Sequence, residues 1–270
     1  MSETELACYV YCIAPAGELP PLQGLAGIDP SFEIRCITED GLSAVVSCVR
    51  SRDFAADALK EKLEDLAWLE RTARTHDEVL ARVLAGNAVV PLRLCTIFAD
   101  EDGVREVLRR ERESLMATLR RVRGRSEWSV KVLADPAALQ SAVRERSSPV
   151  AEADEPAAGR AYFARKRLER VAKEDARARI ERAAEETDAC LRAHAADATR
   201  LPPQARQLSG RPGEMVLNGA YLVERSSAAE FAALTKALDA RHRGTGLALE
   251  LSGPFAPYNF VSGGTHADDG

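Results

Sequence analysis

The sequence predicts an α+β protein of two domains, because strand-like runs alternate with amphipathic helical stretches and one uninterrupted helical stretch occupies the middle of the chain. That stretch covers about residues 157–199, contains no proline, and consists mostly of Ala, Arg, Glu, Leu and Lys. These residues lose little side-chain entropy in a helix. At 1.5 Å per residue the helix is roughly 60 Å long, so part of it should project from its domain or pair with another helix.

A narrow apolar stripe follows this helix at spacings of three and four residues. It includes Leu168, Val171 and Ile180, and oppositely charged pairs such as Glu169–Lys173 stand four residues apart on the outer face. The pattern is typical of a short coiled coil or a helical arm, and a solvated helix lying on its own domain is the alternative. As an arm, it would contact a partner through these three apolar residues.

The first domain is expected at residues 1–123. An apolar run at 5–14 predicts a strand, and runs at 32–38 and 42–49 around the turn Glu39-Asp40-Gly41 predict a hairpin. A helical region from Asp53 to Gly86 follows, in which a break near 68–74 would give two helices. The remaining elements are a strand at 87–98 and a helix at 100–123.

The second domain is expected at residues 124–262. Its order is strand (127–133), the long helix, strand (214–224), a helix capped by Ser226 or Ser227, and strand (247–251). That order predicts a ferredoxin-like domain whose first helix is extended into the coiled-coil-like rod. Residues 147–159 are expected to be a loop, residues 201–213 a connector, and residues 263–270 a disordered tail.

Composition and charge exclude several classes of protein. The 270 residues are 46% apolar and 29% charged, with a net charge of −5, which argues against nucleic-acid binding. No apolar run is long enough to span a membrane, and the N-terminus lacks the basic region of a signal peptide. The six cysteines form no C-x-x-C pair, which favours buried, reduced thiols in a cytoplasmic protein.

The sequence contains no motif that predicts catalysis, a cofactor or a metal site. Phosphate-binding and dinucleotide-binding glycine patterns are absent, as is a nucleophile elbow. The four histidines stand far apart, and His76 lies near an apolar helical stripe, where a packing role is favoured. An enzyme built from Arg93, His76 and scattered carboxylates is the alternative, and the expectation is no enzyme and no cofactor.

Two features could contact a partner. Arg93 stands within the apolar run VVPLRLCTIF, so it should pair with a carboxylate in the fold or face a ligand or partner. The segment 253–261 is rich in proline and aromatic residues, and either caps the core of its own domain or forms an aromatic docking surface. The candidate residues of this segment are Pro254, Phe255, Pro257, Tyr258 and Phe260.

Three stretches together resemble the gas vesicle GvpF/GvpL family. They are VYCIAPA at 10–16, VVPLRLCTIFADEDGVREVL at 89–108, and the run from MVLNGAYLVE to GPFAPYNFV at 215–261. The family typically shows Y-x-Y-x-I, P-L-R-F-G-T and G-P-W-P-P-Y-x-F at these places. Leu94-Cys95 replace the usual Phe-Gly, and Phe255-Ala256 replace the usual Trp-Pro.

The resemblance implies a non-enzymatic accessory protein of gas vesicle formation. Such a protein would bind the hydrophobic shell subunit GvpA and other accessory gas vesicle proteins during nucleation of the shell, in the cytoplasm and on the vesicle. The family also implies an α+β N-terminal domain and a ferredoxin-like C-terminal domain with a helical extension. Self-association through the long helix, a ligand-sensing ferredoxin-like regulatory module and a coiled-coil scaffold remain alternatives.

Overall fold

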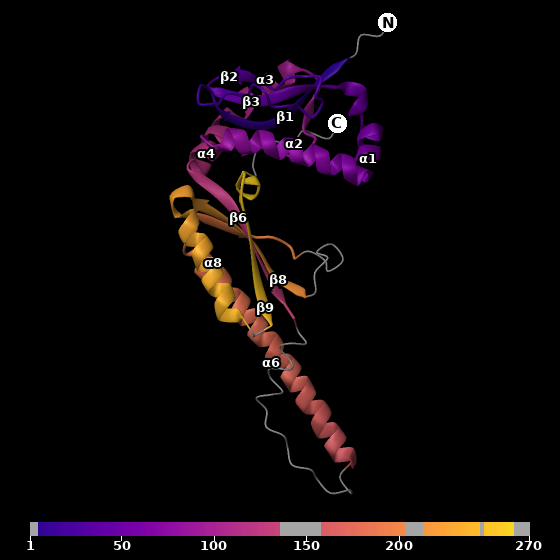
Figure 1. Ribbon diagram of the computed structural model, residues 1–270, viewed down its shortest axis with the longest axis vertical. Helices are drawn as coiled ribbons and strands as arrows, with labels where there is room; N and C mark the ends of the chain where they lie inside the picture. The colour runs from indigo at the N-terminus through magenta and orange to yellow at the C-terminus, as the bar shows by residue number, and fades with distance from the viewer. Residues whose placement is uncertain (1–4, 136–157, 204–212, 244–245, 262–270) are drawn as a thin grey trace. The chain divides into compact units, whose positions relative to one another are not determined.

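The computed structural model describes residues 5–135, 158–203, 213–243 and 246–261 of a chain that mixes helices with β-sheet. The chain divides into two compact units (Figure 1). The first comprises residues 1–127 and 254–270, and the second residues 128–253. The division after Glu127 lies close to the expected boundary near Gly124. Residues 254–261, however, group with the first unit, whereas the sequence assigned them to the second.

The first unit contains a five-stranded sheet. Its strands are β1 (Leu6–Pro15), β2 (Arg35–Glu39), β3 (Leu42–Arg50), β4 (Val90–Pro91) and β5 (Ile97–Phe98). The order is β2-β3-β1-β4, and β5 also pairs with β1. The expected hairpin is present as β2 and β3, and its two turn residues Asp40 and Gly41 have φ of 45° and 83°. Such values are typical of the two-residue turns that match the twist of a hairpin.

Strand β1 is the centre of this unit. Every residue from Ala7 to Pro15 is buried, and successive strand residues point to opposite faces, so both faces of the sheet are covered. Helix α2 (Leu66–Leu84) supplies Val79, Leu80 and Val83 to the core that holds Tyr9 and Tyr11. Helices α3 (Glu101–Arg110) and α4 (Arg112–Val122) also contact the strands.

Two expected helices are each divided. The first is preceded by the short helix η1 (Ser51–Asp53) and breaks between α1 (Ala56–Glu64) and α2. The break is at Asp65, whose carboxylate accepts the N–H groups of Ala67 and Trp68 and so caps α2. It therefore lies just before the region 68–74 where the sequence suggested it. The second helix breaks at Glu111, where a continuous helix was expected.

The continuous strand expected at 87–98 is wrong. Strands β4 and β5 pair with β1 at separate places, Val90 opposite Ile13 and Ile97 opposite Tyr9. Between them the chain turns, because the Thr96 N–H donates to the Arg93 carbonyl and Cys95 adopts a φ of 63°. A left-handed residue interrupts the extended backbone that a continuous strand requires.

Among its described residues, the second unit has the element order β-α-β-β-α-β. Its elements are β6 (Arg125–Ala134), α6 (Ala158–Arg192), β7 (Asp197–Arg200), β8 (Glu214–Glu224), α8 (Ala228–His242) and β9 (Leu247–Phe255), with the short helix η3 (Arg225–Ser227) before α8. The strands form a four-stranded sheet in the order β7-β8-β6-β9. Ser227 precedes α8 as expected, but its side chain makes no capping hydrogen bond.

Helix α6 ends at Arg192, before the expected end at residue 199, and strand β7 follows it. The segment around β7 lacks alternating apolar residues, so it has no pattern that predicts a strand. Its pairing partner specifies it instead, since β7 pairs antiparallel with β8 from Asp197 opposite Leu222 to Arg200 opposite Gly219. The expected disordered tail at 263–270, most of the loop at 147–159 and much of the connector at 201–213 lie outside the described residues.

Candidate partner-binding surfaces

Nothing in the described residues resembles a catalytic or metal centre. No group of three His, Cys, Asp or Glu side chains in those residues is arranged to hold a metal ion. None of the described helices is both long and apolar enough to span a membrane. His76 is 1% exposed and lies in the core of the first unit, where burial lowers its pKa to about 4. It is therefore a neutral packing residue at pH 7, as the sequence favoured.

The hydroxyl of Tyr9 connects His76 to the turn that contains Cys95. It accepts the Cys95 N–H at 3.1 Å and lies 2.9 Å from His76 Nδ1. The single proton of the hydroxyl can be donated to Nδ1 when the neutral imidazole carries its own proton on Nε2. Cys95 is one of two non-glycine residues with a positive φ among the described residues. The backbone here therefore suits the glycine that the P-L-R-F-G-T pattern has at this position.

Arg93 is exposed, and among the described residues no carboxylate lies within ion-pair distance of its guanidinium. The expected structural ion pair is therefore not found in this part of the chain, and Arg93 faces solvent from the turn between β4 and β5.

The expectation that all six thiols are buried is wrong in part. Cys8 and Cys12 are buried, Cys36 is exposed, and the other three are partly exposed; all are unpaired.

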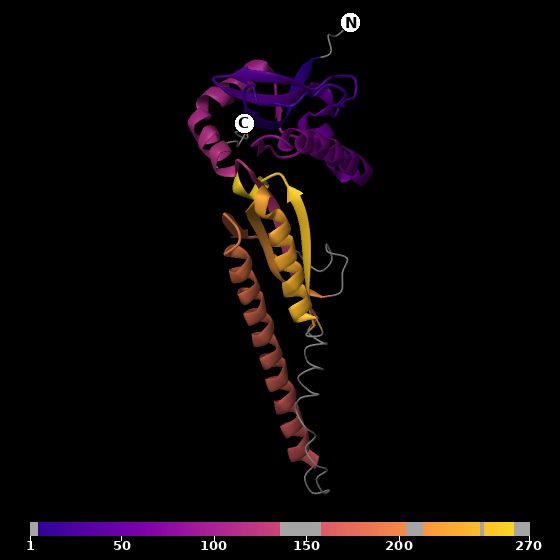
Figure 2. The ribbon, with the colours of Figure 1, turned by 60° about the vertical axis from the view of Figure 1, so that its left-hand side comes forward.

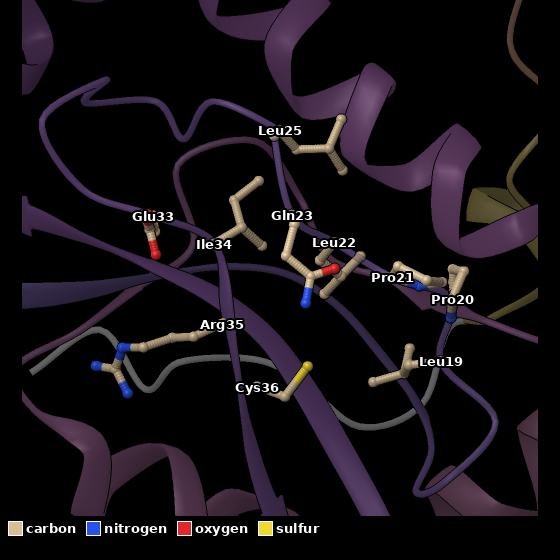
Figure 3. Close-up of a pocket in the computed structure, with 11 residues that line it drawn as sticks. Leu19, Pro20, Pro21, Leu22, Gln23, Leu25, Glu33, Ile34, Arg35 and Cys36 are labelled. Atoms are coloured by element: carbon tan, nitrogen blue, oxygen red, sulfur yellow. The ribbon is translucent and has the colours of Figure 1, made fainter.

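A groove lies beside β2, which is an edge strand of the first sheet (Figure 3). Its volume is about 540 Å³, and it lies between residues 19–25 of the loop after β1 and residues 33–36 of the chain entering β2. Six of its eleven lining residues are apolar, namely Leu19, Pro20, Pro21, Leu22, Leu25 and Ile34, and Gln23, Glu33 and Arg35 add polar groups to the same lining. A β-bridge between Ala26 and Glu33 joins the loop to the chain that enters β2.

The register of the hairpin determines which backbone groups face outward along this edge. Glu39 pairs with Leu42 across a two-residue turn, and that closing pair is hydrogen-bonded. Hydrogen-bonded and non-hydrogen-bonded pairs alternate along an antiparallel ladder, so the N–H and C=O groups of Thr38 and Cys36 point away from β3. Both residues are exposed. The edge thus offers hydrogen-bonding groups beside an apolar groove.

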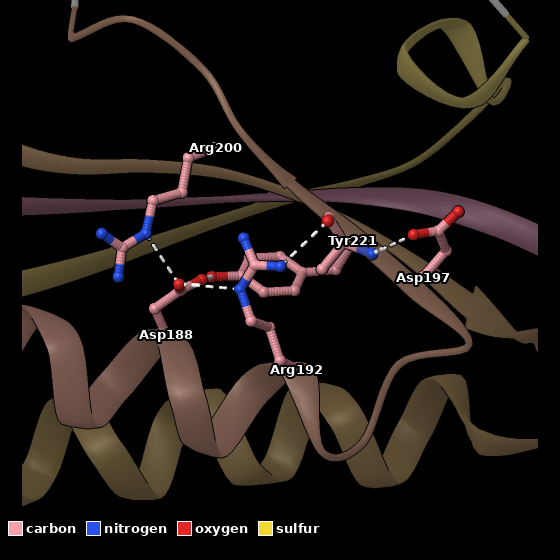
Figure 4. A network of polar contacts seen from close by, with 6 residues as sticks. Asp188, Arg192, Asp197, Arg200 and Tyr221 are labelled. Carbon is pink, nitrogen blue, oxygen red and sulfur yellow. Dashed lines mark hydrogen bonds and ion pairs between the residues drawn. The ribbon is translucent and has the colours of Figure 1, made fainter.

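The C-terminal half of α6 is fixed to its sheet by a buried carboxylate (Figure 4). The side chain of Asp188 is 4% exposed and accepts hydrogen bonds from Tyr221 Oη at 2.7 Å and from Nε of Arg192 and of Arg200, each at 2.8 Å. Burial alone would raise the pKa of Asp188, but these three hydrogen bonds lower it below its ordinary value. The ionised carboxylate therefore connects α6 to β7 and β8.

The N-terminal half of α6 extends beyond the sheet of its own unit (Figures 1 and 2). Val171 is 41% exposed and Phe163 is 71% exposed, whereas Ile180 is only 7% exposed and packs with Val132, Leu217 and Leu247. Ile180 is therefore a core residue, and its assignment to a partner surface is wrong. The side chain of Leu168 lies outside the described residues.

The segment after β9 also divides. Pro254 and Phe255 are exposed, whereas Pro257 and Phe260 are buried and Tyr258 packs against the core of the first unit. The buried carboxylate of Glu127 accepts hydrogen bonds from the N–H and side-chain amide of Asn259, at 2.8 and 2.6 Å. Arg121 donates to the Phe260 carbonyl. This segment therefore caps a core, and the core belongs to the first unit.

Sequence reasoning missed the groove beside β2 and the Asp188 cluster. The loop of the groove has no pattern beyond its prolines and glycines, and Asp188 is one acidic residue among many on a charged helix. An aspartate on the same helical face as Ala184 and Leu191 was the available signal for a buried carboxylate, since a charge on that face needs partners.

The comparisons with known proteins agree with one another. The model of the family described as "Gas vesicle synthesis protein GvpL/GvpF" matches residues 7–262. Gas vesicle protein L of Streptomyces sp. (strain CB03234) is 35% identical over 261 residues, covering 96% of this chain and 94% of that protein. Gas vesicle protein F of the same strain is 32% identical, covering 95% of this chain and 100% of that protein.

Two solved structures share the fold. GvpF from Anabaena sp. PCC7120 has a TM-score of 0.68 at 18% identity, covering 97% of this chain and 99% of that one. GvpF from Microcystis aeruginosa has a TM-score of 0.65 at 21% identity, covering 94% and 98%. Together with the family match over nearly the whole chain, these findings show that the chain belongs to the gas vesicle synthesis protein GvpL/GvpF family.

Proposed function

We propose that this protein is a non-enzymatic accessory protein of gas vesicle assembly that binds the hydrophobic shell subunit GvpA, and other accessory gas vesicle proteins, while the shell is nucleated. Family membership supports a role in gas vesicle formation. The observation that carries shell binding is the combination of the exposed edge of β2 with the apolar groove beside it.

The surface chemistry of a hydrophobic subunit explains why the edge of β2 would bind it. Apolar surface and unpaired strand edges associate indiscriminately when a subunit is not yet in its shell. A strand of the subunit that added to β2 would satisfy its backbone groups with those of Thr38 and Cys36. Its apolar side chains would enter the groove lined by Leu22, Leu25 and Ile34. The subunit would then be protected until it joined the shell.

We further propose that the two units are domains and that the second is ferredoxin-like. Its element order β-α-β-β-α-β and its sheet order β7-β8-β6-β9 support this topology. In this description α6 is the first helix of the domain, and its N-terminal half is a helical extension. The protein would act in the cytoplasm and on the growing vesicle.

Co-expression with a GvpA-type shell subunit tests the proposed function. We expect the subunit to be recovered in the soluble fraction and to co-purify with this protein. If the subunit remains insoluble and unbound, direct shell binding is wrong, and the role shifts to scaffolding other accessory proteins.

A proline substitution tests whether β2 is the site. Thr38→Pro removes an N–H that points away from β3, which an edge strand tolerates, and should lower recovery of the subunit about tenfold. Thr38→Val is the matched control: it loses the same 2.9 Å side-chain bond to Ser43 but keeps the N–H. Equal recovery with both variants would exclude the β2 edge.

Alkylation gives a second measurement of the same site. Cys36 is exposed beside the groove, whereas Cys190 is partly exposed in the second unit. Bound shell subunit should slow maleimide modification of Cys36 and leave the rate at Cys190 unchanged. Equal slowing at both thiols would indicate general coverage and not occupation of the groove.

A further inference from the structure

The chain as a whole is negatively charged, but the first part of α6 is positively charged. Residues 158–182 contain nine Lys and Arg residues and four Asp and Glu residues, a net charge of +5. The remainder of the chain contains 28 basic and 38 acidic residues, a net charge of −10. The basic stretch includes the half of α6 that extends beyond the sheet (Figure 2). We call residues 158–182 the basic arm.

Several cations of the basic arm have no carboxylate partner among the residues that the structure describes. Arg170 pairs with Glu174 at 3.8 Å and Arg177 with Glu181 at 3.0 Å. Within the described residues no ion pair is formed by four other exposed side chains of the arm: Arg167, Lys173, Arg179 and Arg182. Their charge is therefore available to a partner, and only salt screens it.

Two large apolar side chains accompany Arg167 on one face. Phe163, Arg167 and Val171 are spaced by four residues, which places them on the same side of a helix. Phe163 is 71% exposed and Val171 41% exposed. Ala176, Ile180 and Ala184 lie on a different face and pack in the core of the second unit. The outer face thus combines apolar contact area with positive charge.

We propose that this face of the basic arm docks an acidic, amphipathic helix of a different protein. Apolar side chains of that helix would cover Phe163 and Val171, and its carboxylates would pair with Arg167, Arg170 and their neighbours. This surface is separate from the groove beside β2, and the inference does not rest on binding of the shell subunit.

The charge pattern disfavours other occupants. The arm of a second copy carries the same +5, so two arms repel each other. Glu174 lies on the same face as Arg170 and Val171, and the whole chain is negative, which opposes a nucleic acid or an anionic membrane. A partner helix with interspersed carboxylates and apolar residues fits this face, because it meets both kinds of side chain.

The first experiment measures binding of synthetic helices to the full-length protein by fluorescence anisotropy. One probe has about three heptads of Leu and Ala with Glu on the flanking positions, and its counterpart has Lys in place of Glu. We expect the Glu probe to bind and the Lys probe not to bind. We also expect the affinity for the Glu probe to fall about tenfold between roughly 50 and 500 mM NaCl. Absence of binding, or equal binding of both probes, would overturn the proposal.

Charge reversal locates the site. The double variant Arg167→Glu, Arg170→Glu should weaken binding of the Glu probe at least about tenfold and remove most of its salt dependence. Arg71→Glu, Arg74→Glu is the matched control, since these residues are also exposed and close together on a helix. Phe163→Ser should weaken binding at both salt concentrations, because apolar contact is not screened. Equal loss in the control pair would overturn the assignment to the arm.

Further measurements on the same protein samples distinguish the other possible ligands of the basic arm. Sedimentation at low salt should show no concentration-dependent dimer, and vesicles with anionic lipid or duplex DNA should not displace the Glu probe. A dimer that the double variant abolishes would identify a second copy as the occupant and overturn the proposal. Displacement by vesicles or DNA through Arg167 and Arg170 would overturn it in favour of those ligands.

Discussion

Both units bury a tyrosine hydroxyl against an ionisable side chain, but the two pairs differ in charge. In the first unit Tyr9 faces His76, whose pKa burial lowers to about 4, so the pair is neutral at pH 7. In the second unit Tyr221 donates to Asp188, whose pKa lies below its ordinary value, so that pair is ionised.

The two pairs differ in charge because arginines contact Asp188, and not because one group is buried more deeply than the other. Asp188 and His76 are both buried, but Asp188 receives hydrogen bonds from Arg192 and Arg200, which are partly exposed. His76 packs among Tyr9, Tyr11 and apolar side chains. A buried group keeps its charge where opposite charge reaches it and loses its charge where only neutral groups do. The two clusters should therefore respond differently to mutation and to pH.

The largest expected effect is at the ionised cluster. Asp188→Ala should lower the free energy of unfolding by about 3 kcal/mol, because it leaves the buried Tyr221 hydroxyl unpaired and places two arginines together without a carboxylate. Asp175→Ala, on the exposed half of the same helix, should change it by less than about 0.5 kcal/mol. Urea unfolding at pH 7 measures both. Similar values for the two variants would mean that Asp188 does not hold α6 to the sheet.

The neutral cluster should be sensitive to mild acid. The pKa of His76 is about 4 in the folded protein and near 6.5 in the unfolded chain, so the unfolded state binds more protons between these values. Stability is therefore lost as the pH falls from about 6.5 to 4, and roughly 2 kcal/mol of the loss occurs between pH 7 and pH 5.

Asp188 responds in a different range. The pKa of Asp188 in the folded protein is depressed, so its contribution to stability is intact above about pH 4 and is lost only at lower pH.

The variant His76→Asn tests the source of the acid sensitivity. It keeps an acceptor for Tyr9 and should remove the loss of stability between pH 7 and pH 5, as measured by urea unfolding at each pH. An unchanged pH dependence in this variant would assign the acid sensitivity to other groups.

The smallest effect concerns Cys95, whose N–H donates to Tyr9. Cys95→Gly should raise the free energy of unfolding by about 0.5 kcal/mol, because glycine adopts a positive φ without strain while a partly buried thiol is lost. Cys36→Gly, in the extended backbone of β2, should instead lower it by about 1 kcal/mol. Thermal unfolding of the two variants checks the opposite signs. A loss at both positions would show that the contacts of the thiol outweigh the backbone strain.

Local patterns were sufficient for most of the fold. The burial around β1, the Asp40-Gly41 hairpin and the presence of a long helix at α6 all depend on residues that are near one another in sequence. The elements that were missed depend on distant partners. Strand β7 exists because β8 pairs with it, and the run at 87–98 is divided because Cys95 turns toward Tyr9.

The candidate surfaces were less predictable for the same reason. The stripe on α6 continues from Val171 to Ile180 without a change in pattern, yet one residue is exposed and the other is core. The difference in exposure depends on where the sheet beneath the helix ends, and the sequence of the helix does not specify that position. Likewise, Pro254 to Phe260 reads as one motif, but its first two residues are exposed and most of the rest is packed.

The first unit is completed by residues from both ends of the chain, since Ala256, Tyr258 and Phe260 pack with segments that precede Trp128. The ribosome synthesises those residues after the whole of the second unit. The second unit, a continuous insertion, can fold as soon as it has been synthesised, whereas the first keeps an incomplete core until residues 254–261 have been added. Losing the final few residues of the described chain would thus impair the unit whose synthesis began first and leave the later one intact.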